Sequence, residues 1–173
     1  MREFVRTNTS LARLSSSSKW LYGSFLVLII AGFLSSVVLY YGSMGLGPST
    51  AAQYFVGNAD DPSATQILLE KSFRQLMETA HFHLFTMPVL LLILGHLFLL
   101  GKSEPWRTVV VVAAAVVTAL HVAGPFVVRY GGAGFGWVMP ATGIPFLLLY
   151  LFLAVVSLRD LLSKPPPRPS REG

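Results

Sequence analysis

The chain has 173 residues, of which 53% are hydrophobic and only 12% are charged, and its formal net charge is +5. Soluble domains carry about 25% charged residues, so this composition predicts an integral membrane protein. The absence of cysteine excludes disulfides, iron–sulfur ligation by cysteine, thiolate catalysis and covalent haem attachment through C-x-x-C-H. The basic residues gather in tails and short loops beside apolar runs, which indicates membrane topology and no nucleic-acid partner.

Four apolar runs each approach the length of about 20 residues that a helix needs to cross a bilayer. The third run is rich in valine, but in lipid it must be helical because its backbone groups have to be satisfied internally. The first run is too long for the apolar core of a cleaved signal peptide, so we interpret it as a retained anchor. The predicted spans cover about 20–41, 77–100, 108–128 and 139–158.

The distribution of lysine and arginine predicts the orientation of these spans. Ten of the thirteen lie in the N-terminal tail, the 101–107 loop and the C-terminal tail. The positive-inside rule then places both termini in the cytoplasm. We expect the membrane to be a bacterial inner membrane. We predict an all-α fold, a four-transmembrane-helix bundle over 20–158, between a cytoplasmic N-tail at 1–19 and a disordered cytoplasmic C-tail at 159–173.

The outer segment 42–76 is predicted to begin as a loop in GSMGLGPST. Asp61-Pro62 then has the form of an N-cap followed by proline at the first helical position. The helical spacing of TQILLEKSFRQLMETA predicts that this helix continues into the second span, which makes it long and outward-reaching. The aromatic residues of the glycine-rich 129–138 loop are expected to lie at the membrane interface.

The second run, ETAHFHLFTMPVLLLILGHLFLL, contains three histidines. A neutral imidazole carries one donor and one acceptor, and hydrocarbon satisfies neither. The second and third spans are antiparallel, and at about 1.5 Å rise per residue His83 and His121 lie at one depth in the outer half of the membrane. Two imidazoles so placed can ligate a b-type haem axially, so we predict His83 and His121 as ligands of the haem iron.

Two residues near His121 are predicted to complete this site. Thr118 is positioned to accept a hydrogen bond from the ring N–H of His121 across one turn, and Gly124 would let a flat macrocycle approach the backbone. The alternative is that these small residues only let the helices pack closely.

His81 and His96 are candidates for an alternative or second site. His81 lies some 200° around the helix from His83, so it is either an interfacial residue, a competing ligand, or part of a proton path with Glu78. His96 follows His83 by 13 residues, and this spacing resembles membrane cytochromes b of the bc type, which hold two stacked haems. The facing span has no histidine near Val109, so a second haem would need a ligand from elsewhere. The alternative is a hydrogen-bonded histidine or one that lines a quinone or proton route.

The four spans together with the His83–His121 pair resemble small four-helix integral membrane cytochromes b. The resemblance implies one haem b, with a second haem and a quinone left open. It also implies electron transfer between a quinone pool and an outward redox partner, which would be another membrane or periplasmic subunit. Catalysis would then belong to an oxidoreductase complex and not to this chain alone.

Two further hypotheses belong to other classes of protein. One is a cofactor-free structural or assembly subunit of a membrane complex. The other is copper binding or transport through His81, His83, Met77 and Met87, because Met77 and His81 share a helix face and thioether and imidazole ligands suit copper. A hydrolase finds no support, since neither G-x-S-x-G nor H-E-x-x-H occurs.

Overall fold

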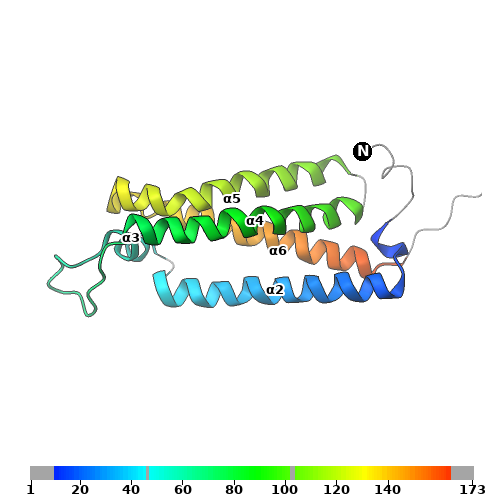
Figure 1. The fold of residues 1–173 in the computed structure, drawn as a ribbon, viewed down its shortest axis with the longest axis horizontal. Coiled ribbons are helices and arrows are strands. Elements are labelled where there is room, and N and C mark those ends of the chain that lie inside the picture. Colours follow the sequence, from blue (N-terminus) through cyan, green and yellow to red (C-terminus); the bar gives the residue numbers. More distant parts are fainter. Residues whose placement is uncertain (1–9, 46, 102–103, 165–173) are drawn as a thin grey trace, which may run out of the picture.

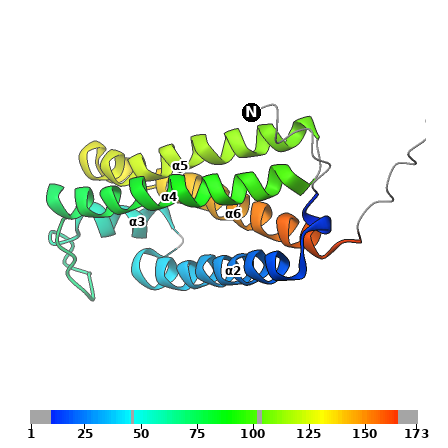
Figure 2. The ribbon, with the colours of Figure 1, turned by 45° about the vertical axis from the view of Figure 1, so that its right-hand side comes forward.

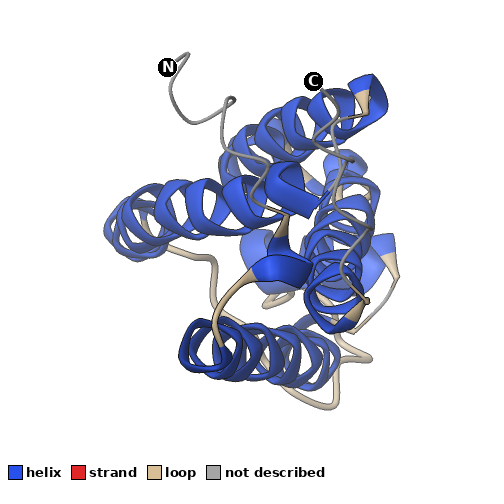
Figure 3. Ribbon diagram, turned by 90° about the vertical axis from the view of Figure 1, so that its right-hand side faces the viewer, coloured by secondary structure: helices blue, strands red, loops and turns tan. Residues whose placement is uncertain are grey.

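A computed structural model describes residues 10–45, 47–101 and 104–164, and the regular elements in these residues are all helical (Figures 1 and 3). Four long helices are each apolar enough to cross a membrane. They are α2 (Ser16–Met44), α4 (Phe73–Gly101), α5 (Pro105–Gly131) and α6 (Val138–Leu162). Between and before them lie η1 (Leu11–Arg13), α3 (Pro48–Val56) and η2 (Ala133–Phe135). The predicted all-α four-helix fold is confirmed, and each predicted span lies inside one long helix.

Helix α6 is the centre of the bundle. It packs against α2, α4 and α5, and α4 and α5 also pack against each other. Helix α2 lies along α6 and stands apart from α4 and α5 (Figures 1 and 2). Many large apolar side chains on the outward faces are exposed, among them Leu28, Leu92 and Leu148. An apolar surface of this extent is suited to contact with lipid.

The two ends of the bundle differ. The first and last described residues, Ser10 and Lys164, lie at one end together with the junction between α4 and α5; we call this the terminal end (Figure 1). The loop end holds α3, the 57–72 segment and η2. The cytoplasmic location of the terminal end stays a prediction. Residues 1–9 of the predicted N-tail and 165–173 of the predicted C-tail lie outside the described residues. Helix α2 begins at Ser16 within the predicted N-tail, and α6 continues to Leu162 within the predicted C-tail.

A buried ion pair joins α5 and α6 at the terminal end. Arg107 Nη2 donates to Asp160 Oδ2 at 2.7 Å, and Arg107 Nη1 donates to the backbone carbonyl of Phe98 on α4. The two charged side chains are only 3% and 13% exposed. The guanidinium also lies over the Phe98 ring, 4.6 Å from its centroid. A Cβ on Gly101 would collide with Asp160, so glycine at 101 leaves the room that the pair needs.

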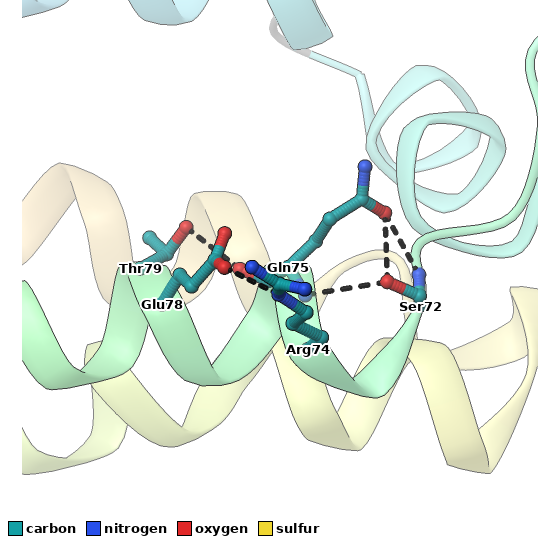
Figure 4. Close-up of polar contacts among 5 residues, drawn as sticks. All are labelled: Ser72, Arg74, Gln75, Glu78 and Thr79. Carbon is teal, nitrogen blue, oxygen red and sulfur yellow. Dashed lines mark hydrogen bonds and ion pairs between the residues drawn. The ribbon is translucent and has the colours of Figure 1, made fainter.

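Helix α4 begins at Phe73, which corrects the predicted start near Asp61-Pro62. A reciprocal capping box explains the start (Figure 4): the backbone N–H of Gln75 donates to Ser72 Oγ at 3.3 Å, and the N–H of Ser72 donates to Gln75 Oε1 at 2.9 Å. Asp61 instead closes a turn by accepting hydrogen bonds from the hydroxyl and the N–H of Ser63, which lower the pKa of its carboxyl.

The backbone groups of residues 66–71 bond to the end of α3 and not to a helix of their own. Asn58 accepts from the N–H of Leu68 at 2.6 Å and donates to the carbonyl of Gln66 at 3.0 Å. The N–H of Lys71 donates to the carbonyl of Phe55 at 2.9 Å. Helix α3 itself lies partly in the predicted loop GSMGLGPST, where Pro48 occupies its first turn.

The ion pair at the terminal end predicts a large effect of Arg107→Met. The substitution leaves the buried Asp160 carboxylate unpaired, so we expect the free energy of unfolding to fall by about 3–5 kcal/mol. Unfolding of the purified protein in detergent, followed by circular dichroism, measures this change. Arg159→Met removes a neighbouring exposed arginine and should shift the free energy by less than about 0.5 kcal/mol. Equal effects of the two variants would contradict the structural role of the pair.

Candidate functional site

A cavity of about 630 Å³ occupies the loop-end half of the bundle. Its volume lies within the range of about 300–1,000 Å³ typical of small-molecule sites. It forms where α2 leans on α6 and stands away from α4 and α5. Its apolar walls are aromatic and thioether side chains: Phe33, Tyr40, Met44, Tyr54, Phe55, Met87, Met139 and Phe146. We call the polar and partly exposed part of its lining near the start of α4 the mouth: Lys71 just before α4, and Gln75, Glu78 and Thr79 in its first two turns.

His83 and His121 both line this cavity, so the two histidines paired by depth in the sequence are brought to one site. His83 Nδ1 lies 2.8 Å from the carbonyl oxygen of Thr79, one turn earlier on α4. A carbonyl oxygen only accepts, so the ring must carry its proton on Nδ1 to make this bond. The lone pair of the neutral imidazole then resides on Nε2.

His121 reaches the same tautomer through a threonine on α6. Its Nδ1 lies 3.1 Å from Thr142 Oγ1, and that hydroxyl donates to the carbonyl of Val138 at 2.8 Å. The single hydroxyl proton of Thr142 is therefore already used, so Thr142 accepts from the Nδ1–H of His121. Neither histidine has an Nε2 hydrogen bond within the described residues, so both Nε2 lone pairs are free to bind a metal at the cavity.

Three residues of α6 hold the His121 ring. Thr142 fixes the Nδ1 proton, and the Phe146 ring stacks on the imidazole with 5.1 Å between centroids and 19° between planes. Gly143 lies against the imidazole: a Cβ there would stand 3.2 Å from His121 Cε1. The sequence reasoning missed all three. The available signal was a polar Thr-Gly pair early in the fourth span, but its pairing with His121 depends on how α5 and α6 pack.

Thr118 and Gly124 lie one turn on either side of His121, and both face α6. The Thr118 hydroxyl donates to the Ala114 carbonyl at 2.7 Å and lies 2.9 Å from the hydroxyl of Tyr150. The predicted hydrogen bond from His121 to Thr118 is therefore wrong, because Thr142 provides that acceptor. Gly124 is buried, and a Cβ there would stand 3.1 Å from Met139 Sδ. Its missing side chain therefore lets α6 pack closely on α5 and does not widen the cavity.

His81 and His96 do not line the cavity. Both are exposed on outward faces of α4, and His81 lies beside Phe85 with 4.8 Å between ring centroids. Met77 is also exposed, at 42%. The four residues of the copper hypothesis therefore do not converge, since only His83 and Met87 face the cavity.

The His121 ring lies in a slot between Gly143 and Phe146. We therefore expect Gly143→Val to destabilise the protein. The new side chain presses on an imidazole that Phe146 backs, so we expect the free energy of unfolding to fall by about 1–3 kcal/mol. Gly32→Val, at a helical glycine with open space around it, is the matched control. In a His121→Ala background the cost of Gly143→Val should shrink, which detergent unfolding of the four variants measures. Additive costs would show that Gly143 and His121 do not share this slot.

A family model described as a transmembrane helical domain matches residues 45–168, which include α3, α4, α5 and α6. No curated protein and no solved structure matches the chain. Because the match covers well over half of the chain, the protein belongs to the Aq_1264_TM family of transmembrane helical domains.

Proposed function

We propose that the protein is a haem-b-binding membrane subunit that carries electrons between a quinone pool and a redox partner at the loop end. The observation that carries this proposal is the pair of Nδ1-protonated histidines, His83 and His121, on one cavity. Each has its second nitrogen free, and neutral imidazole nitrogen is a preferred ligand of haem iron. Cavity volume and aromatic walls also suit a flat, apolar macrocycle.

His83 and His121 would hold the iron, and the bound haem would supply a one-electron iron(III)/iron(II) couple. The chain's own residues set the conditions for this couple. Hydrogen bonds to the Thr79 carbonyl and the Thr142 hydroxyl orient the rings and raise the ligand strength of Nε2. The apolar walls, including Phe33 and Phe146, exclude water and keep the local dielectric low.

The position of the cavity supports a partner at the loop end. The cavity is lined in part by α3, by Lys71 just before α4 and by the first turns of α4, and all of these lie at that end. A partner that docks on α3 and the 57–72 segment would approach the cavity more closely than one at the terminal end. Residues of α2 and of α4 both line the cavity, so a quinone would enter between these two helices from the lipid side.

The proposal predicts which histidines the haem spectrum depends on. The protein, produced with ample haem and kept in lipid nanodiscs, should show a b-type α-band in the reduced-minus-oxidised spectrum. His83→Ala and His121→Ala each remove one residue that would hold the haem iron and should abolish or strongly shift this band. His81→Ala and His96→Ala are the matched controls, because both rings are exposed outside the cavity. A haem-free wild-type protein, or a band that needs His81 or His96, would refute the assignment.

Copper binding is a second candidate function. Three of the five methionines, Met44, Met87 and Met139, line the cavity together with His83 and His121. Thioether sulfur favours copper(I), so this set differs from the originally predicted one but keeps its chemistry. Copper and haem analysis of the same nanodisc sample separates the two functions. A cofactor-free assembly subunit would contain neither, and its partner binding would survive His83→Ala and His121→Ala.

A further inference from the structure

Four charged residues lie in the stretch from Glu70 to Glu78, and within the described residues all of them except Lys71 form ion pairs. Glu70 pairs with Arg129 at 2.7 Å, and Glu78 pairs with Arg74 at 2.8 Å (Figure 4). Lys71 lies between Glu70 and Arg74 in the sequence, and no carboxylate of the described residues forms an ion pair with it. Lys71 also lines the cavity mouth. The mouth therefore presents one ammonium group whose charge the described residues leave unmatched.

The backbone of Lys71 is held on both sides. Its N–H donates to the Phe55 carbonyl at 2.9 Å, and its carbonyl accepts from Arg129 Nε at 2.8 Å. Its Nζ lies 4.2 Å from the centroid of the Tyr54 ring, and Tyr54 lines the same cavity. An aromatic face attracts the cation but accepts no conventional hydrogen bond, so the three ammonium donors stay available.

An apolar cavity with a positioned ammonium at its mouth fits an amphiphilic ligand with an acidic end. We propose that Lys71 binds a carboxylate of the molecule that occupies the cavity, while the apolar body of that molecule lies between His83, His121 and the aromatic walls. For haem b, the carboxylates are the two propionates, which then point to the loop end; this form rests on the proposed function. A long-chain fatty acid offers the same chemistry from another source.

The other polar residues of the mouth fit this role less well. Glu78 is anionic, and Arg74 already matches its charge. The side-chain oxygen of Gln75 accepts in the capping box with Ser72, and the amide N–H groups of Gln75 carry no charge. The hydroxyl of Thr79 donates to the Gln75 carbonyl at 3.1 Å. Lys71 is therefore the mouth residue with free hydrogen-bond donors and a free charge.

The test compares ligands with and without free carboxylates. Hemin and hemin dimethyl ester are titrated into the haem-free protein in nanodiscs, and binding is followed by absorbance. Lys71→Met should weaken hemin binding about tenfold, because a charge-assisted hydrogen bond is lost, and leave the ester within about twofold. Lys71→Arg should restore hemin affinity. Lys164→Met, the same change at an exposed lysine of the terminal end, should alter neither titration.

Unchanged ester binding also shows that Lys71→Met is folded. Equal loss of hemin and ester affinity, or loss of neither, would overturn the role of Lys71 while leaving the histidine ligands standing. If the wild type binds no hemin, the proposed haem function fails and cis-parinaric acid with its methyl ester replaces the hemin pair. Preference for the free acid that Lys71→Met removes would then support Lys71 and assign a fatty acid as the source. Equal affinity for acid and ester would refute it.

Discussion

An imidazole among apolar helices needs partners for both of its ring nitrogens, and the loop-end half of this bundle is arranged around that requirement. The Thr79 carbonyl and the Thr142 hydroxyl each accept a hydrogen bond from an Nδ1–H, and His83 and His121 line one cavity with Nε2 left unbonded within the described residues. Leaving two such acceptors unbonded would be costly in a closed apolar core. The cavity removes that cost only when a ligand or water molecule inside it bonds to the Nε2 atoms. The histidine pair and the cavity therefore form one site.

Polar groups are paired with each other at the terminal end of the bundle, whereas at the loop end several line a cavity. At the terminal end, Arg107 and Asp160 form an ion pair in a nearly closed environment, and Gly101 provides the space. At the loop end, His83, His121 and Lys71 line a cavity, and within the described residues the histidine Nε2 atoms have no hydrogen bond and the Lys71 ammonium contacts only the Tyr54 ring. The ion pair therefore supports the packing of α4, α5 and α6, whereas the polar groups of the loop end remain available to a ligand.

Much of the architecture could be predicted from the sequence because lipid allows few alternatives. A run of about 20 apolar residues must be a helix there, and all four predicted spans lie in long helices. The capping box at Ser72 and Gln75 was also readable from the sequence, but the proline after Asp61 gave a competing signal. The non-helical 66–71 segment was not readable, because its backbone partners on α3 and Asn58 come from tertiary contacts.

The site was predictable only as far as helical geometry reaches. Depth and helical angle select His83, which lies on the inward face of α4 with Leu76, Ala80 and Met87, at steps of three and four residues. Thr142 and Gly143 required the packing of α6 on α5, which the pattern of one helix does not contain. Sequence spacing also placed Thr118 beside His121, but the Thr118 hydroxyl bonds to the Ala114 carbonyl and to the hydroxyl of Tyr150 on α6.

His96, which lies outside the cavity, also needs partners for both of its ring nitrogens. Its ring lies on an outward face of α4, between Leu92 and Leu99, which are themselves exposed. The 13-residue spacing from His83 resembles a two-haem helix, yet 13 residues amount to about 1,300° of helical rotation, or roughly 140° short of four full turns. His83 and His96 therefore face different directions, and one inward-facing site cannot use both. Within the described residues His96 has no hydrogen-bond partner, so the second-haem interpretation requires a ligand from outside the four helices.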